Sequence, residues 1–298
     1  MATGRIDVQQ QEQPHWQCVL VLWGSRYPVS DVNRIVAQIR AGARHQPRFV
    51  LITDRDRPGL AAGVEQRFFP DYFLQHPFTA SGCQAKLAMF EQGVVPDDLP
   101  AVYVDLDTLV TGDLMRGIAL MRDRRSILML QSVVLPFGWP GRLVHRLTGG
   151  HRYARGNSSV VVFHPAECGF IAQRFHEVWA AHPDMSFRPT IADERFISWV
   201  AQDRMIALPR SFAAKLSAEF MLPFSWLIAL RTRLPWVRRR RAGLAAVTLS
   251  GPEVKAHELL SLPEGAMITD RKGRALIWSD RAMGPFRQQL IDAYAHDG

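Results

Sequence analysis

The sequence predicts an α/β fold with a mainly parallel sheet flanked by helices. Short apolar runs, typical of strands buried on both faces, alternate with segments of helical periodicity over about the first two thirds of the chain. Glycine and proline turn signals separate the two kinds of segment. The chain has 298 residues, of which 47% are hydrophobic, so it can bury a core of the size that this fold needs.

Strands and helices are expected in alternation. The expected strands, all short and apolar, are 17–24, 48–54, 101–107, 126–131 and 159–165. The expected helices are 28–42, 83–93, 112–122, 166–181 and 191–202. In the first helix, Ser30 is a candidate N-cap and Gly42 a candidate stop. A Gly/Pro/Trp-rich loop at 132–156 interrupts the alternation and is expected to cover a pocket, since ligands bind beyond the carboxyl ends of parallel strands.

Two carboxylates lie at the end of the third expected strand, in the stretch "AVYVDLDTLVTGDL". Asp105 and Asp107 are two residues apart, so on a strand both side chains leave on the same side. Carboxylates held that close repel each other unless one is protonated, both face water, or a cation lies between them. Mg²⁺ or Mn²⁺, with oxygen ligands at about 2.0–2.1 Å, satisfies the pair best and would leave room for the oxygens of a substrate diphosphate.

The chain resembles the DxD glycosyltransferases of the GT-A fold, specifically the family-eight type that includes glycogenin and bacterial lipopolysaccharide galactosyltransferases. The resemblance covers roughly residues 17–260 and rests on landmarks that occur in the family's order. These are "LWGSRYPVSDVNR", "RFVLITD", "AKLAMFE", "VYVDLDTLVTGDL", "GNSSVVVFHP" and "IADERFI". The resemblance implies a catalytic domain at 17–260, preceded by a frayed tail at 1–16 and followed by a C-terminal extension at 261–298 with a terminal helix.

The resemblance implies a role for each residue at the matching positions. Asp105 and Asp107 would bind the cation, and Asp105 would also approach the ribose. Residues expected at the nucleotide and donor phosphates are Trp23, Gly24, Asp54, Lys86 and Lys255. Asn157 and Asp193 would hold the transferred sugar near its anomeric carbon.

Each of these residues also has a structural interpretation without chemistry. Lys86 could be an exposed helical lysine, Asn157 a turn residue, and Asp193 a helix cap. Trp23 could simply be packed against an apolar core.

Two departures from the family pattern concern the metal and the sugar. The family closes its metal site with a histidine, but "TLSGPEVKAHE" places Ser250 there, and a hydroxyl is a weaker ligand for a transition metal. His257 is an alternative ligand if the loop bends. Glu194 stands where the family has glutamine, which adds a negative charge beside the sugar.

The resemblance implies transfer of a sugar from a nucleotide-diphosphate sugar, in particular a UDP-sugar, to an acceptor hydroxyl of a cell-surface glycan or glycolipid, with retention of anomeric configuration. A catalytically degenerate nucleotide- or glycan-binding protein is the first alternative. The second is a sugar-1-phosphate nucleotidyltransferase. The stretch "LWGSRYP" faintly resembles the glycine-rich loop of those enzymes. That stretch has a single glycine and no lysine soon after it.

A basic, apolar insertion at 223–243 contains "FSWLIALRTRLPWVRRRRAG". Aromatic and aliphatic residues beside clustered arginines are typical of segments that lie on an anionic membrane surface. A packed helix followed by a solvated arginine loop, or an arginine cluster that binds an anionic acceptor, are the alternatives. The net charge of +8 favours acidic partners in general, but no nucleic-acid reader motif accompanies it.

The remaining features predict a cytoplasmic protein that could lie at the inner face of the cell membrane. The amino-terminal stretch is polar and Gln-rich and lacks the apolar core of a signal peptide. The longest apolar runs are too short to span a bilayer. Cys18, Cys83 and Cys168 form no CxxC pair, which favours reduced thiols.

Overall fold

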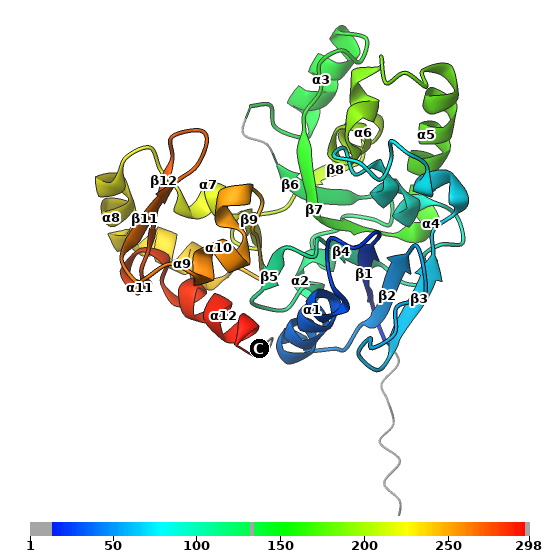
Figure 1. Ribbon diagram of the computed structural model, residues 1–298. Helices are drawn as coiled ribbons and strands as arrows, with labels where there is room; N and C mark the ends of the chain where they lie inside the picture. The colour runs from blue at the N-terminus through cyan, green and yellow to red at the C-terminus, as the bar shows by residue number, and fades with distance from the viewer. Residues whose placement is uncertain (1–13, 132–133, 296–298) are drawn as a thin grey trace, which may run out of the picture.

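A computed structural model describes residues 14–131 and 134–295, and its centre is a seven-stranded sheet (Figure 1). The strand order is β3-β2-β1-β4-β7-β6-β8. Pairs β3–β2, β2–β1, β1–β4 and β6–β8 are parallel, whereas β7 runs antiparallel to both neighbours. The strands of this sheet are β1 (Gln17–Leu22), β2 (Arg48–Thr53), β3 (Val64–Phe68), β4 (Ala101–Val104), β6 (Ile127–Gln131), β7 (Gly156–Phe163) and β8 (Met205–Ala207). The predicted α/β class and mainly parallel sheet are confirmed.

Successive side chains along the strands point to opposite faces of the sheet, which divides the core into two clusters, one on each face. On β1, Val19 and Val21 belong to one cluster, while Cys18, Leu20 and Leu22 belong to the other. The first cluster is covered by η2, α5 and α6, and the second by α1. Every residue of β1 is buried, as expected for a central strand covered on both faces.

The helical elements agree with the prediction in position more than in length. Around the sheet lie α1 (Val29–Gly42), η1 (Asp71–Leu74), η2 (Gln84–Phe90), α2 (Met115–Ile118), α3 (Trp139–Leu147), α4 (Pro165–Cys168), α5 (Phe170–Ala181), η3 (Arg188–Ile191) and α6 (Asp193–Val200). The segment predicted as a helix at 83–93 is a 3₁₀ helix, and that predicted at 112–122 is a single turn. Pro28, not Ser30, occupies the N-cap position of α1.

The segment 132–156 was wrongly predicted to be all loop, because its described part contains α3 and the start of β7. α3 exposes the large apolar side chains of Trp139, Leu143 and Leu147, which are four residues apart. Since residues four apart lie on one helix face, these side chains form an apolar stripe on the surface.

A smaller lobe is built from the chain after about residue 208, with one strand contributed by the first half (Figure 1). Its elements are β5 (Thr108–Val110), β9 (Ala213–Lys215), α7 (Leu216–Phe220), α8 (Ser225–Arg233), α9 (Pro235–Ala242), β10 (Ala246–Thr248), η4 (Pro252–Val254), α10 (Ala256–Leu260), β11 (Ala266–Thr269), β12 (Ala275–Trp278), α11 (Asp280–Met283) and α12 (Pro285–Tyr294). One hydrophobic cluster joins Leu216 and Leu259 with Trp278 and Leu290, so residues on both sides of position 260 share a core.

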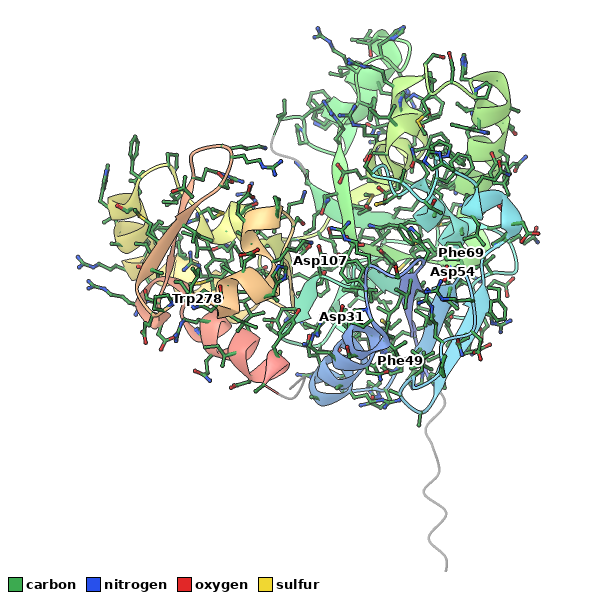
Figure 2. The ribbon with its side chains drawn as sticks, viewed as in Figure 1. Asp31, Phe49, Asp54, Phe69, Asp107 and Trp278 are labelled. Atoms are coloured by element: carbon green, nitrogen blue, oxygen red, sulfur yellow. The ribbon has the colours of Figure 1, made fainter. Side chains whose placement is uncertain are left out.

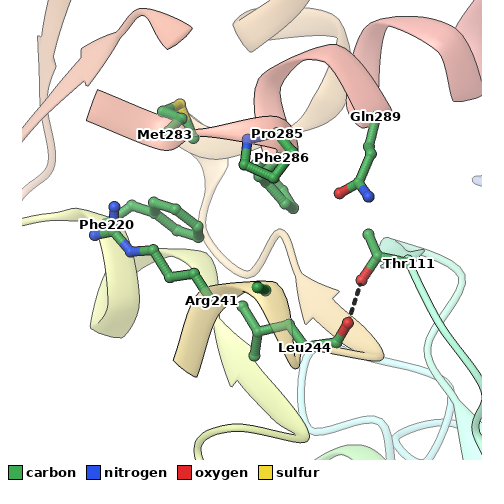
Figure 3. Close-up of a pocket in the computed structure, with 9 residues that line it drawn as sticks. Thr111, Phe220, Arg241, Leu244, Met283, Pro285, Phe286 and Gln289 are labelled. Carbon is green, nitrogen blue, oxygen red and sulfur yellow. Dashed lines mark hydrogen bonds between the residues drawn. The ribbon is translucent and has the colours of Figure 1, made fainter. Parts of the chain in front are cut away.

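The basic insertion forms α8 and α9, and three of its arginines serve a structural purpose. The Glu219 carboxylate, only 2% exposed, accepts hydrogen bonds from Arg240 at 2.8 Å, Arg241 at 2.9 Å and Arg231 at 3.3 Å. Arg241 also lies over the Phe220 ring, with its guanidinium carbon 4.3 Å from the centroid (Figure 3). These arginines therefore neutralise a buried carboxylate and are not a free cationic surface.

A small pocket lies beside this arginine cluster (Figure 3). Its lining includes Phe220, Arg241, Met283 and Phe286, and the Thr111 hydroxyl donates to the Leu244 carbonyl at 2.8 Å at its edge. The pocket contains none of the residues predicted to bind the donor.

The amino-terminal prediction is wrong at Trp16. Residues 1–13 of the predicted tail lie outside the described residues, but the Trp16 side chain is fully buried and its Nε1 donates to the His45 carbonyl at 2.9 Å. Within the described ranges, the helices are all too short or too polar to cross a membrane.

Candidate active site

Several of the predicted site residues lie at the carboxyl ends of β1, β2 and β4. Gly24 follows β1, Asp54 follows β2, and Asp105 follows β4. Because these three strands are adjacent and parallel, their ends meet at one edge of the sheet. Asp107 lies a little further along, where the central sheet meets the smaller lobe, and Asp54 lies on the other side of β1 (Figure 2).

Asp54 ties the first two strand ends together. Its carboxylate accepts the Gly24 backbone N–H at 3.0 Å and an Arg57 guanidinium N–H at 2.5 Å. Burial favours the neutral acid, but the Gly24 N–H and Arg57 outweigh it and hold the pKa of Asp54 below its usual value. Arg57 and Arg55 each donate to the Gly24 carbonyl at 2.8 Å. This loop therefore has a fixed backbone and carries positive charge.

Trp23, at the same strand end, is packed as well as placed near the site. Its Nε1 donates to the Thr79 carbonyl at 3.1 Å, and its ring meets Phe69 edge to face.

Asp105 lies in a turn that follows β4, not on the strand itself. β4 ends at Val104, and the Thr108 N–H donates to the Asp105 carbonyl at 3.0 Å. The expectation that strand alternation directs Asp105 and Asp107 to the same side is therefore wrong, because a turn sets their directions. The Asp105 backbone N–H donates to the Ser159 carbonyl at 2.9 Å, which anchors the turn to β7.

The Asp105 carboxylate is held by a lysine and a tyrosine. Lys86 Nζ donates to Oδ1 at 2.6 Å, and the Tyr103 hydroxyl donates to the same oxygen. Burial would raise the pKa of Asp105, but Lys86, together with hydrogen bonds from Lys86, Tyr103 and Ser159, holds it below its ordinary value. Conversely, burial would lower the pKa of Lys86, yet Asp105, Tyr103 and Asp193 raise it well above the usual range. Asp105 and Lys86 therefore form a charged pair.

Asp193 completes this cluster from the first residue of α6. Its side chain is 7% exposed, and its carboxylate accepts the Ser158 hydroxyl at 2.6 Å and lies 3.8 Å from Lys86 Nζ. Its backbone N–H donates to the Gly82 carbonyl at 3.0 Å. A Cβ at position 82 would overlap the Ile191 carbonyl oxygen, so glycine permits the approach that brings Lys86 and Asp193 together. Ala192, not Asp193, occupies the N-cap position of α6.

Burial raises the pKa of Asp193 to about 6, with Lys86 and Ser158 offsetting part of the effect. A carboxyl whose pKa is raised on folding stabilises the protein most at low pH, and that contribution is lost as pH rises through the folded value. The wild type should lose this contribution as pH rises from 4 to 8, whereas Asp193→Asn has no carboxyl to lose it. The unfolding free energy of Asp193→Asn minus that of the wild type is therefore expected to increase by about 2 kcal/mol over that range. Urea unfolding across that range measures the gain, and a difference independent of pH would contradict it.

Asn157 lies on β7 beside a bulge in the sheet, not in a turn. The register between β6 and β7 shifts after Met129, and Leu130 is paired with Asn157. The Asn157 amide donates to Glu194 Oε2 at 2.6 Å. Glu194 and Asp193 thus reach β7 side by side, one through Asn157 and the other through Ser158.

Asp107 is paired with a second lysine, which comes from the smaller lobe. Lys255 Nζ donates to Asp107 Oδ2, across 148 residues of sequence. Lys255 sits between η4 and α10, and the Gly251 backbone that leads into η4 has φ +124°, a value that favours glycine. The backbone beside Asp107 is fixed as well, since the Leu249 N–H donates to the Asp107 carbonyl at 2.9 Å.

The oxygen atoms near Asp107 suit a hard cation. Asp107 Oδ1 is buried and accepts no hydrogen bond from the described residues, and the same holds for the Thr108 hydroxyl. Thr248, paired with Thr108 in the β5–β10 register, has its hydroxyl 3.0 Å from that of Ser250. Among residues 14–131 and 134–295, no group of three or more His, Cys, Asp or Glu side chains could hold a metal. A cation here would thus rely on the two aspartates, with water and substrate oxygens filling the other positions, as Mg²⁺ often does.

His257, the other suggested ligand, is exposed at the start of α10 and is paired with Glu258 at 3.4 Å. The structure also includes two residues that sequence reasoning missed, Tyr103 and Ser158. Both could have been noticed as polar residues on otherwise apolar strands, but which partner each would contact depends on neighbours distant in sequence.

Comparisons with known proteins give a fold and no family. No family model matches this chain, and no curated protein matches its sequence. Among solved structures, the galactosyltransferase LgtC in complex with donor and acceptor sugar analogs is 14% identical, with 80% of this chain and 88% of that chain covered at a TM-score of 0.53. An active-site variant of LgtC with glutamine replaced by glutamate is also 14% identical, with 79% and 88% covered at a TM-score of 0.55.

The bifunctional glycosyltransferase WbbM is 11% identical, and the match covers 95% of this chain and 50% of that chain at a TM-score of 0.54. Each match covers at least 79% of this chain, although it covers only half of WbbM. The predicted fold is therefore confirmed: the chain has the GT-A fold of these glycosyltransferases.

Proposed function

We propose that this protein transfers a sugar from a nucleotide-diphosphate sugar, in particular a UDP-sugar, to an acceptor hydroxyl. One observation carries the proposal. In a GT-A fold, the Asp105–Lys86–Asp193 cluster lies at the carboxyl edge of the parallel strands, where α/β sheets bind their ligands. LgtC, one of the structures that share this fold, was solved with donor and acceptor sugar analogs.

The reaction converts a nucleotide-diphosphate sugar and an acceptor hydroxyl into the glycosylated acceptor, a nucleoside diphosphate and a proton. The bond between the anomeric carbon and the diphosphate oxygen breaks, so positive charge grows on the sugar and negative charge on the departing group. Lys86, held by Asp105, and Lys255, held by Asp107, place positive charge near the site of the diphosphate. A divalent cation held by Asp105 and Asp107 would supply further charge neutralisation when bound.

Asp193 and Asn157 are proposed to orient the sugar. Both are fixed by neighbours, Asp193 by Ser158 and Asn157 by Glu194, so little reorganisation is needed when the donor binds. Ionised carboxylates at positions 193 and 194 would stabilise positive charge that develops at the anomeric carbon. Retention of configuration and a cell-surface glycan or glycolipid as acceptor stay part of the proposal.

A panel of nucleotide sugars, each incubated with Mn²⁺ or Mg²⁺, tests the function. Release of UDP from a UDP-sugar is the expected result, and Asp105→Ala with Asp107→Ala in one chain is the inactive control. Release of pyrophosphate from a nucleoside triphosphate would instead identify a nucleotidyltransferase. Tight UDP binding without hydrolysis or transfer across the panel would identify a degenerate binding protein.

We further propose that α8 and α9 contact an anionic membrane surface, which would bring a lipid-linked acceptor to the enzyme at the inner face of the membrane. This surface exposes Phe224, Trp226, Leu230 and Trp236, and Arg233, Arg238 and Arg239 are exposed beside them. Aromatic rings next to arginines are typical of interfacial segments.

Replacing Arg238 and Arg239 by glutamate is expected to lower binding to vesicles that contain anionic lipid by tenfold or more, because each basic residue near such a surface contributes about 1 kcal/mol. Co-sedimentation measures the loss. The matched control is Arg271→Glu with Lys272→Glu, in an exposed turn between β11 and β12. Equal binding by both variants would exclude this surface.

A further inference from the structure

The two lysines of the candidate site hold their aspartates in different ways. Lys86 lies within ion-pair distance of two carboxylates, Asp105 at 2.6 Å and Asp193 at 3.8 Å, and its side chain is 12% exposed. Lys255 is paired with Asp107, and its side chain is 20% exposed. Lys86 is thus fixed on two sides within one lobe, whereas Lys255 reaches across from the smaller lobe to a single carboxylate.

Lys255 occupies one of the two places where a cation could bind Asp107. It donates to Oδ2, while Oδ1 is buried and accepts no hydrogen bond from any described residue. A divalent cation on Oδ1 would lie beside an ammonium group on the same carboxylate, and the two positive charges would repel each other. The Lys255–Asp107 pair therefore disfavours cation binding at Asp107.

A nucleoside diphosphate offers Lys255 a partner of higher charge. If the ammonium moves to a phosphate oxygen, Asp107 loses its counter-ion and its affinity for a divalent cation rises. By thermodynamic linkage, a cation on Asp107 would equally favour the position of Lys255 on the phosphate.

We propose that Lys255 acts as an internal competitor for the cation: it neutralises Asp107 in the absence of donor and releases it to the cation when a nucleoside diphosphate binds. This inference rests on the proposed function, since it assumes that the site binds a nucleotide. Lys255 is in this sense a positioning residue that makes binding of donor and cation interdependent.

The decisive measurement is Mn²⁺ binding in the absence of nucleotide. The electron paramagnetic resonance signal of free Mn²⁺ reports how much of the ion stays unbound. Nucleotide is omitted because UDP itself chelates Mn²⁺ and would obscure the effect. Lys255→Met is expected to bind Mn²⁺ about tenfold more tightly than the wild type, and Lys255→Gln should do the same. Lys255→Arg keeps the charge and should stay weak, as should Lys272→Met, which removes an exposed lysine elsewhere.

A second measurement separates this inference from the proposed function. In EDTA, UDP binding by calorimetry is expected to weaken about tenfold in Lys255→Met and to be unchanged in Lys272→Met. If the wild type binds no UDP, the proposed function fails, whereas the Mn²⁺ comparison still stands. Internal competition is wrong if the wild type binds UDP but Lys255→Met and Lys255→Gln bind Mn²⁺ no more tightly than the wild type does. It is equally wrong if none of these proteins binds Mn²⁺.

Discussion

Replacing Asp105 with asparagine is expected to lower sugar transfer about 1,000-fold or more. The carboxylate holds Lys86 through a 2.6 Å hydrogen bond and is one of the two proposed cation ligands, so the variant loses both at once. Removal of a single preorganised electrostatic group from an active site typically lowers the rate about 10²–10³-fold. Asp105 positions two such groups, Lys86 and the proposed cation. Initial rates of UDP release at saturating donor measure the loss.

The control for this variant is Asp203→Asn. The Asp203 side chain is 70% exposed, and among the described residues its ion pairs are with Arg142 and Arg146 of α3, not with residues of the cluster. It should transfer sugar at the wild-type rate. Far-ultraviolet circular dichroism would show whether Asp105→Asn is folded. A folded Asp105→Asn protein with more than a tenth of wild-type activity would remove Asp105 from the proposed mechanism.

Replacing Glu219 with glutamine is expected to destabilise the protein by about 3 kcal/mol or more, whatever its function. Glutamine has nearly the same shape but no charge, so Arg231, Arg240 and Arg241 would be left close together without a counter-ion. Breaking a buried ion pair by neutralising one partner costs about 3–5 kcal/mol. Urea denaturation measures the change in unfolding free energy.

Glu177→Gln is the matched control, because Glu177 is paired with Arg174 on the surface of α5 and both side chains are about half exposed. Surface pairs contribute about 0–1 kcal/mol, so this variant should be nearly as stable as the wild type. If the two variants unfold alike, Glu219 does not anchor the smaller lobe.

Local pattern was sufficient to predict the central strands. β1, β2 and β4 are continuous apolar runs, and such runs remain strands because both faces of a central strand are covered. β3 was missed because its "VEQRF" is half-exposed at the sheet edge and lacks an apolar pattern. The short strands β9 and β10 were missed because three residues are too few to show a period, and their pairing creates them.

The site could be predicted as a set of residues but not as a set of contacts. Asp54, Asp105 and Asp193 stand next to recognisable strands and a helix, so their position at one sheet edge follows from the α/β pattern. The Lys86–Asp105 pair could not be deduced, since it requires a 3₁₀ helix to turn the lysine toward β4. In the same way, Arg231, Arg240 and Arg241 looked like part of a free basic surface until the position of Glu219 was known.

The sequence alone determined the α/β class, the positions of the main strands along the chain and the edge at which polar groups collect, because these depend on periodicity within short segments. Only the tertiary structure decided which charge neutralises which: Lys86 for Asp105, Lys255 for Asp107, and three arginines for Glu219. The physical reason is that ion pairing depends on distance in space and on burial, and Lys255 and Asp107 are 148 residues apart in the chain.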